Sequence, residues 1–501
     1  MSDFDFDLIV LGGGPGGSTV ASFTAMQGHR VLLLEREKFP RHQIGESLLP
    51  STVHGVCRLL GLSEELKRHH FPVKRGGTFR WGRNDEPWTF TFSDRPDSPT
   101  GTAYQVERAK FDAILLNNAR AKGVEVREEH AATELLFEGD RVVGVAYTDR
   151  EGRPGRARAR FVVDSGGHRS GFYRQCGERV YSEFFQNVAL YAYYEHGRRL
   201  PPPNAGNILC VAFKEGWFWY IPLSDTLTSV GAVVSREAAP KIQAGAEAAM
   251  RTWIDETPMI RDYLSSATRV TSGTYGEYRV RKDYSYCNTR FWRPGFALVG
   301  DAACFIDPVL SSGVHLATYS ALLAARSINT YLRQGPAREE AYFAEFERRY
   351  RREFGNFYQF LVGFYDMQVD ETSYFWSARK IVNTGERDNV PFVRLVAGLS
   401  DVEEPLFGGG HEFFDNRVGF GNWFEANLAT EHAGFGARRG ARSTVADTGA
   451  FDPDKFMAGF TSEIAHVQLL ALLGEDRGRE KPLFTSGLVP TSDGLHWMAA
   501  S

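Results

Sequence analysis

The chain has 501 residues, of which 43% are hydrophobic, and its 58 Lys and Arg nearly balance its 62 Asp and Glu, for a formal net charge of −4. At roughly 150 residues per domain, this length predicts about three domains and a large buried core. The near-neutral charge offers no basic surface for nucleic acid and no polybasic patch for an anionic membrane, so we expect neither as a partner.

The cysteines and the N-terminal residues bear on cellular location. Five scattered cysteines include no C-x-x-C pair, and they stand at Cys57, Cys176, Cys210, Cys287 and Cys304. They predict neither a disulfide framework nor a metal site, and a cytoplasmic location fits them best. Residues 1–14 are acidic and then briefly apolar, which predicts a buried strand instead of a signal peptide or a membrane helix.

The first elements in the chain form a strand, a helix and a strand. Apolar runs at Asp7–Leu11 and Val31–Leu34 predict the strands, and Ser18–Gln27 predicts the helix between them. A polar loop then leads into a helix predicted from Pro50 to His70. Residues 74–106 alternate aromatic and polar side chains, which predicts an antiparallel sheet with one covered face.

In the middle of the chain, the alternation of strands and helices seen near the N-terminus occurs twice more. Arg108–Lys122 has helical spacing, and residues 124–163 predict strands separated by turns. Residues 185–290 predict mainly a second antiparallel sheet. The short apolar strand Phe296–Val299 and the long helix Gly313–Leu332 follow. A nucleotide-binding type of fold is therefore predicted to be interrupted and then resumed.

The segment between the first strand and the first helix has the glycine spacing of a dinucleotide site, formed by Gly12, Gly14, Pro15, Gly16 and Gly17. Glycines there permit a tight turn and let a pyrophosphate approach the positive end of the helix. Glu35 ends the second strand, next to Arg36, and is placed to accept hydrogen bonds from ribose hydroxyls. This context favours a nucleotide site over a simple glycine turn.

A second element favours FAD over NAD. Gly300 and Asp301 follow a strand and precede a long helix, where the Asp301 carboxylate can bind ribityl hydroxyls. The alternative for Asp301 is a helix cap. Because the sequence has no second glycine fingerprint for a nicotinamide nucleotide, a separate flavin reductase is expected to supply FADH2.

These features predict an α/β fold in which an FAD-binding Rossmann-like domain is interleaved with an antiparallel β-sheet substrate domain, as in flavin hydroxylases. A mainly helical C-terminal region follows. The predicted boundaries are 1–75, 100–180 and 290–335 for the FAD-binding domain, 76–99 and 181–289 for the substrate domain, and 336–501 for the C-terminal region. Residues 403–450 are rich in Gly, Phe and Arg and predict a mobile lid.

The sequence closely resembles the flavin-dependent halogenases in GGGPGG at 12–17, RHQIGESLLP at 41–50, FPVKRGG at 71–77, GWFWYIP at 216–222 and GDAACFIDPVLSSGVH at 300–315. The likeness is greatest to the tyrosyl and β-hydroxytyrosyl halogenases of glycopeptide antibiotic and related nonribosomal peptide pathways. It extends into LLALLGEDRGREKPLFTSGLV near the C-terminus. The resemblance implies that FADH2 and O2 give a flavin hydroperoxide, which chloride attacks to release hypochlorous acid.

The resemblance also implies two catalytic residues, Lys74 and Ser312. Lys74 matches the lysine that hydrogen-bonds to hypochlorous acid or is chlorinated by it, and Ser312 and Gly313 flank the chloride site. From the residues alone, Lys74 is a solvated surface charge and Ser312 is an ordinary helix N-cap. The segments that contact the cofactor in the family also contain Arg41, Ser47, Gln105, Arg108 and Val314. Arg108 could equally be a surface charge.

An aromatic strand carries a further part of the expected site. Trp217, Trp219 and Ile221 share one face of this strand, which ends at Pro222. The pattern is typical of an aromatic core strand. The resemblance adds that these rings wall the flavin chamber off from the organic substrate, and both roles can hold together.

Leu310 is the main departure from the halogenases that act on tryptophan, which carry a glutamate at this place to stabilise charge on the indole. A phenol is activated by its own oxygen and needs no such help. The departure favours a tyrosyl unit on a peptidyl carrier protein. The alternatives are an FAD-dependent aromatic hydroxylase, disfavoured by Lys74 and the tryptophan strand, and a noncatalytic flavoprotein that docks carrier proteins.

Overall fold

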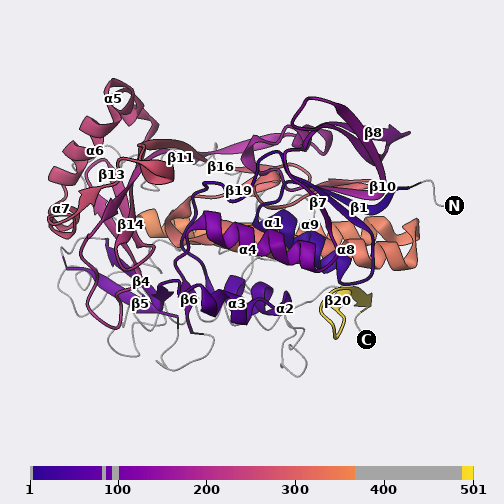
Figure 1. Ribbon diagram of the computed structural model, residues 1–501, viewed down its shortest axis with the longest axis horizontal. Helices are drawn as coiled ribbons and strands as arrows, with labels where there is room; N and C mark the ends of the chain where they lie inside the picture. Colours follow the sequence, from indigo (N-terminus) through magenta and orange to yellow (C-terminus); the bar gives the residue numbers. More distant parts are fainter. Residues whose placement is uncertain (1–3, 82–85, 93–100, 367–487, 500–501) are drawn as a thin grey trace, which may run out of the picture.

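Two β-sheets organise the computed structural model, which describes residues 4–81, 86–92, 101–366 and 488–499. The eight-stranded sheet lies towards one end of the molecule and the nine-stranded sheet towards the other (Figure 1). The lid expected at 403–450 lies outside the described residues.

The eight-stranded sheet has a parallel core in the order β18-β10-β1-β2-β7. These strands are β1 (Phe6–Leu11), β2 (Val31–Leu34), β7 (Glu125–Arg127), β10 (Pro154–Asp164) and β18 (Phe296–Leu298). Antiparallel strands extend it, namely β8 (Ala131–Glu138), β9 (Arg141–Thr148) and β17 (Trp292–Arg293). Strand β2 and residues 8–11 of β1 are continuous, buried apolar runs because helices cover the sheet.

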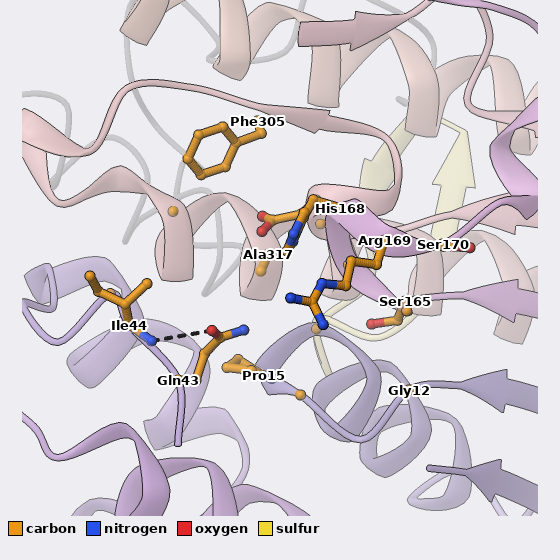
Figure 2. A pocket seen from close by; sticks show the side chains of 18 of the residues that line it. Gly12, Pro15, Gln43, Ile44, Ser165, His168, Arg169, Ser170, Phe305 and Ala317 are labelled. Atoms are coloured by element: carbon orange, nitrogen blue, oxygen red, sulfur yellow. Dashed lines mark hydrogen bonds between the residues drawn. The ribbon is translucent and has the colours of Figure 1, made fainter. Parts of the chain in front are cut away.

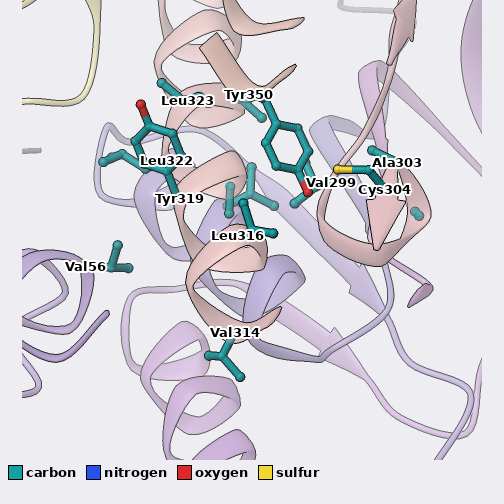
Figure 3. Close-up of a cluster of buried hydrophobic side chains, with 14 of the residues drawn as sticks. Val56, Val299, Ala303, Cys304, Val314, Leu316, Tyr319, Leu322, Leu323 and Tyr350 are labelled. Carbon is teal, nitrogen blue, oxygen red and sulfur yellow. The ribbon is translucent and has the colours of Figure 1, made fainter. Parts of the chain in front are cut away.

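Four helices pack around this sheet: α1 (Pro15–Ala25), α4 (Arg108–Ala121), α8 (Ser312–Gln334) and α9 (Glu339–Asp366). Helix α8 contacts both α1 and α9, and it is buried along almost its whole length. Figure 3 shows Leu316, Leu322 and Leu323 of α8 in the buried cluster that also holds Tyr350 of α9. The N-terminus of α8 is therefore held firmly.

The nine-stranded sheet runs in the order β19-β16-β11-β14-β13-β12-β4-β5, with β15 paired to β11. Its strands are β4 (Gly76–Arg80), β5 (Trp88–Thr91), β11 (Arg179–Glu195), β12 (Ile208–Phe213), β13 (Gly216–Pro222), β14 (Leu227–Ser235), β15 (Thr268–Arg269), β16 (Arg279–Asn288) and β19 (Cys304–Phe305). Only the β4–β12 pair is parallel. This pair joins the two regions of antiparallel strand predicted from the sequence into one sheet.

Three short helices lie beside the nine-stranded sheet: α5 (Ala239–Ala244), α6 (Ala246–Asp255) and α7 (Pro258–Tyr263). Met250, Trp253 and Ile260 form a second apolar cluster with side chains of the strands. The remaining short strands are β3 (Val73–Lys74) with β6 (Ala103–Tyr104), and β20 (Leu488–Pro490) with β21 (Trp497–Ala499). The remaining 3-10 turns are η2 (Gly167–Arg169), η3 (Phe172–Gln175), η4 (Arg236–Ala238), η5 (Gly273–Tyr275), η6 (Gly300–Ala302), η7 (Pro308–Leu310) and η8 (Pro336–Arg338).

The single helix predicted from Pro50 to His70 is wrong. The segment consists of the π-helical η1 (Ser51–Val56), α2 (Cys57–Leu59) and α3 (Ser63–Arg68). Gly61 separates the last two because its φ of +78° lies in the left-handed region, which ends a helix.

The predicted α/β fold class, with its Rossmann-like sheet and its antiparallel sheet, is confirmed. Within the described ranges, no helix has the length and apolar character needed to cross a membrane.

Candidate functional site

A cavity of about 1130 Å³ lies where the two sheets meet. Its floor includes Leu11, Leu34 and Asp164, which end three parallel strands, and the second sheet contributes Tyr191 and Arg281. In Figure 2, Gln43 and Ile44 lie on one side of this cavity and His168, Arg169 and Ser170 on another. Ligands of open α/β sheets bind at this end of the strands.

Most of the predicted site residues line this cavity. They are Gly12, Gly14, Pro15, Gly16, Glu35, Arg36, Arg41, Ser47, Arg108, Trp217, Trp219, Ile221, Gly300, Asp301, Gly313 and Val314. The cavity wall does not include Gly17, Lys74, Gln105, Pro222 or Ser312. The fold therefore brings together residues that are as far apart in the chain as Gly12 and Val314.

The glycine loop is shaped by close approach of backbone atoms. Gly12 has a φ of +98°, and a Cβ atom on it would lie 2.6 Å from the Ser165 carbonyl oxygen. A Cβ atom on Gly17 would lie 1.8 Å from the Gly12 carbonyl oxygen. Gly14 precedes α1 without a capping side chain, so the first N–H groups of the helix are available to a phosphate.

Glu35 holds this loop in place. It is 5% exposed; its Oε2 accepts a hydrogen bond of 2.6 Å from the Gly13 N–H, and its Oε1 accepts one of 2.7 Å from the Glu37 N–H. Each carboxylate oxygen can accept a second hydrogen bond. The geometry therefore leaves acceptor capacity for a ribose hydroxyl at the cavity wall.

Arg41 and Arg108 are joined through Asp112. Arg108 donates to both carboxylate oxygens of Asp112, at 2.8 and 3.0 Å, and Arg41 Nη1 donates to Oδ2 at 3.0 Å. Arg108 also donates to the carbonyl oxygens of Ile44 and Gly45, at 2.5 and 3.2 Å. Because it is only 7% exposed, the interpretation of Arg108 as a surface charge is wrong.

Ser47 and Gln105 face each other in an isolated β-bridge. The Ser47 hydroxyl is buried and makes no hydrogen bond within the described residues. The Gln105 side chain donates through Nε2 to the Gly206 carbonyl oxygen at 3.0 Å. A buried hydroxyl without a partner at a cavity wall is a group that a ligand can satisfy.

Asp301 lies across the cavity in η6. Burial raises the pKa of its carboxyl to about 6, against the opposing effect of Arg108, Arg281 and Arg179. Its side chain caps neither η6 nor α8, so the helix-cap alternative is wrong. With the glycine loop, the Glu35 acceptor and the free Ser47 hydroxyl, the cavity fits FAD in its size and in its donor and acceptor groups.

Lys74 is buried behind the cavity wall, at 2% exposure. Its Nζ donates to the Leu48 carbonyl oxygen at 3.0 Å and to Ser311 Oγ at 3.3 Å, and it lies 5.3 Å from the centre of the Phe92 ring. Burial lowers the pKa of Lys74 to about 7. The interpretation of Lys74 as a solvated surface charge is therefore wrong.

The turn before α8 contains two serines with different environments. Ser311 is the N-cap residue, with a φ of +62°, and lines the cavity, whereas Ser312 is fully buried. The Ser312 hydroxyl has no hydrogen-bond partner in the described part of the chain. The N-cap of α8 is thus Ser311 and not Ser312. Ser311 is also the serine that contacts Lys74, a contact that the sequence did not predict.

The tryptophan strand β13 lines the cavity and also packs in the core. The centres of the Trp217 and Trp219 rings are 6.3 Å apart. Trp217 Nε1 donates to the Tyr365 hydroxyl at 2.6 Å, and Trp219 Nε1 donates to Ser229 Oγ at 3.2 Å. These bonds fix both indoles, so the core role and a position on the cavity wall hold together.

Asp307 was not predicted as a site residue. It is fully buried; its Oδ1 accepts from the Val309 N–H at 3.1 Å, and its Oδ2 accepts from the Tyr365 hydroxyl at 2.8 Å and from Asn187 at 3.0 Å. Asp307 therefore links the turn that precedes α8 to α9 and to β11.

Comparisons with known proteins agree with this site. The chain matches the family model described as tryptophan halogenase over residues 7–98 and 94–417. A solved structure of the myxobacterial chondrochloren halogenase CndH, an FAD-dependent halogenase, is 57% identical and covers 98% of this chain and 99% of its own, with a TM-score of 0.77. Tryptophan 2-halogenase from Chondromyces crocatus is 35% identical over 79% of this chain and 76% of its own. The 1H-pyrrole-2-carbonyl-peptidyl-carrier-protein chlorinase of Pseudomonas fluorescens is 28% identical over 76% of this chain and 88% of its own.

Proposed function

Since the chain belongs to the tryptophan halogenase family of flavin-dependent halogenases, we propose that it chlorinates the phenol ring of a tyrosine or β-hydroxytyrosine unit held as a thioester on a peptidyl carrier protein, in antibiotic biosynthesis. Family membership makes it an enzyme that uses FAD, O2 and a halide on an aromatic substrate. It also sets aside the aromatic hydroxylase and the noncatalytic carrier-docking flavoprotein.

When bound in the cavity, reduced FAD would supply the two electrons that bring O2 to the peroxide level, at which it can oxidise chloride to hypochlorous acid. Flavin-dependent halogenases generally receive reduced FAD from a separate flavin reductase. In our proposal the glycine loop and the start of α1 bind the pyrophosphate, and Glu35 binds the ribose. Arg41, Ser47, Arg108 and Asp301 hold the remainder, because each lines the cavity.

The turn before α8 is the proposed chloride site. Gly313 and Val314 line the cavity at the positive end of a 23-residue helix, which favours an anion. A Cβ atom on Gly313 would meet no atom of another part of the chain within 4 Å, so there is open space beside its Cα atom. The buried Ser312 hydroxyl without a partner adds a donor at the same turn.

Lys74 is the proposed carrier of the oxidised chlorine. With a pKa of about 7, a large share of Lys74 is the free amine near neutral pH. The amine nitrogen can take chlorine from hypochlorous acid, forming an N–Cl bond and releasing water. In the ammonium form, Lys74 can instead donate a hydrogen bond that orients the acid and polarises its O–Cl bond. The contacts with Leu48 and Ser311 suit both forms, because neither partner is charged.

The observation that carries the phenol proposal is the neutral environment of Lys74. Leu310 precedes the Ser311 that Lys74 contacts, and it packs partly buried against the core. Among the described residues, no carboxylate forms a salt bridge with Lys74. A nearby negative charge stabilises the positive charge that develops on an indole during chlorination. A phenol loses the proton of its own hydroxyl group and therefore needs no such carboxylate. The carrier-protein name of one relative supports a tethered substrate.

A substrate comparison tests this proposal. The enzyme, a flavin reductase, O2 and chloride are incubated with tyrosyl carrier protein, free tyrosine or free tryptophan, and the products are analysed by mass spectrometry. We expect one chlorine in place of one hydrogen on the tyrosyl carrier, ortho to the hydroxyl. Chlorination of tryptophan alone would contradict the proposal, as would a product that carries only a new hydroxyl group. Bromide in place of chloride tests the halide.

A further inference from the structure

Three buried or partly buried side chains form a hydrogen-bonded chain beside the cavity. The Tyr193 hydroxyl donates to Glu46 Oε1 at 2.9 Å, and His42 Nε2 lies 2.8 Å from the same hydroxyl oxygen. Glu46 is 2% exposed and Tyr193 is fully buried, whereas His42 is partly exposed. Glu46 and His42 both line the cavity. None of the three has a role in the site described above.

We propose that His42, Tyr193 and Glu46 carry the proton that each halogenation consumes along the wall of the flavin cavity, from water at His42 to the carboxyl of Glu46. One FADH2, one O2, one chloride, one arene and one proton give FAD, the chloroarene and two waters. O2 accepts four electrons, two from FADH2 and two from chloride, so one proton must enter from outside. The inference rests on family membership and on FAD in this cavity, and not on the identity of the arene.

The hydrogen bonds can all point inwards. In the tautomer with hydrogen on Nε2, His42 donates to Tyr193, which donates to Glu46. A proton that leaves the Glu46 carboxyl for the cavity is replaced at Oε1 from the Tyr193 hydroxyl. His42 takes a proton from hydronium at Nδ1 as it gives its Nε2–H to the Tyr193 oxygen, so that the imidazole ends neutral with its hydrogen on Nδ1. Rotation of the Glu46 carboxyl and exchange of the His42 proton with water restore the starting arrangement. No charge has to remain on Tyr193, whose own pKa is raised by burial.

Glu46 can hold the proton near neutral pH. Burial raises the pKa of its carboxyl to about 7, although the Ser229 and Tyr193 hydroxyls and Arg108 oppose this effect. Its second oxygen, Oε2, makes no hydrogen bond within the described residues. One carboxyl oxygen is thus occupied by the chain, and the other is a buried oxygen that can carry the proton.

Burial and the neighbouring arginines keep His42 neutral. Burial together with Arg279, Arg281, Arg108 and Arg41 lowers the pKa of His42 to about 4. Glu107, the residue that precedes α4, acts in the opposite sense near Glu46 and raises the pKa of Glu46. The other titratable groups in contact are the Tyr191 and Tyr275 rings. A neutral imidazole passes a proton without trapping it as a stable cation.

Titration of Glu46 in the FAD-free, full-length protein is the first test. The infrared carbonyl band of a protonated carboxyl should be lost in the wild type with a midpoint near pH 7. It should be absent from Glu46→Gln and present in Tyr193→Phe. A wild type minus Glu46→Gln difference with no such band at any pH would overturn the proposal. Because this test uses neither FAD nor a substrate, it is independent of the tyrosyl assignment.

Turnover of the FAD-loaded enzyme is the second test. Glu46→Gln and Tyr193→Phe should each lower kcat about a hundredfold, raise the solvent deuterium isotope effect on kcat, and leave the FAD dissociation constant unchanged. Tyr275→Phe is the matched control, because its hydroxyl bonds to Glu107 and not to the chain. Variants that turn over like the wild type would overturn the proposal. The proposal would also be overturned if FAD affinity fell by the same factor as kcat, because the residues would then have a structural role.

Discussion

His315 Nε2 lies 2.8 Å from Glu353 Oε1, so that α8 is joined to α9 at a buried point near the proposed chloride turn. His315 Nδ1 lies 2.8 Å from Ser51 Oγ in η1. Ser51 is three residues after Leu48, whose carbonyl accepts from Lys74. One imidazole therefore ties together the helix that starts at the chloride turn and the segment that holds Lys74.

Glu353→Ala should destabilise the protein and weaken chloride binding. The change leaves one nitrogen of the buried His315 without its partner, which costs about 1–3 kcal/mol. The free energy of unfolding in urea and the KM for chloride measure the two effects. Glu353→Gln keeps an acceptor oxygen and should lose less of both. An unchanged chloride KM in Glu353→Ala would show that α9 does not position the turn.

Lys74→Ala should abolish chlorination while FAD still binds. The side chain does not line the cavity, so the flavin absorbance of the purified, reconstituted variant should match the wild type. Loss of product is measured by mass spectrometry under the standard halogenation assay. The control is Lys67→Ala, since Lys67 is a lysine at the surface paired with Glu64. Residual chlorination near the wild-type rate would remove Lys74 from the mechanism.

The buried amine should also give stability a characteristic pH dependence. The folded pKa of Lys74, about 7, lies below the unfolded value of 10.5. Between these values the unfolded state binds more protons, so the free energy of unfolding should rise with pH in this window. Urea unfolding at neutral pH and about two units higher measures the slope. Lys74→Met should reduce it; an identical slope would mean that Lys74 has an ordinary pKa.

Gly12→Ala should abolish FAD binding. The new Cβ atom would lie 2.6 Å from the Ser165 carbonyl oxygen, in addition to the strain of a φ of +98°. Gly152→Ala is the matched control, because its φ is +76° but no atom lies within 4 Å of the added Cβ. That control should lose only about 1–2 kcal/mol of stability and keep its FAD. Flavin retained after gel filtration distinguishes the two variants.

The sequence was sufficient for features that depend on local spacing. The glycine loop, Glu35 and the alternation of Trp217 and Trp219 could be placed because each follows from a strand or turn of a few residues. The helix predicted from Pro50 to His70 failed because Gly61 adopts a positive φ, a conformation that hydrophobic periodicity does not reveal.

The missed residues act through contacts that are distant in sequence. Tyr193 and Glu46 are 147 positions apart, and Tyr365 and Asp307 are 58 apart. Adjacent serines gave no signal for which one would contact Lys74, since the left-handed conformation of Ser311 separates their directions. These contacts depend on how distant segments pack together, which the spacing of residues along the sequence does not reveal.

The tryptophan strand gives the cavity its own optical reporter. Trp217 and Trp219 line the space proposed for the flavin and are held by hydrogen bonds to Tyr365 and Ser229. Energy transfer from these fixed indoles to an oxidised isoalloxazine ring would dim their emission. Occupancy of the cavity could then be followed in real time from the protein's intrinsic fluorescence, without a label and before any substrate is known.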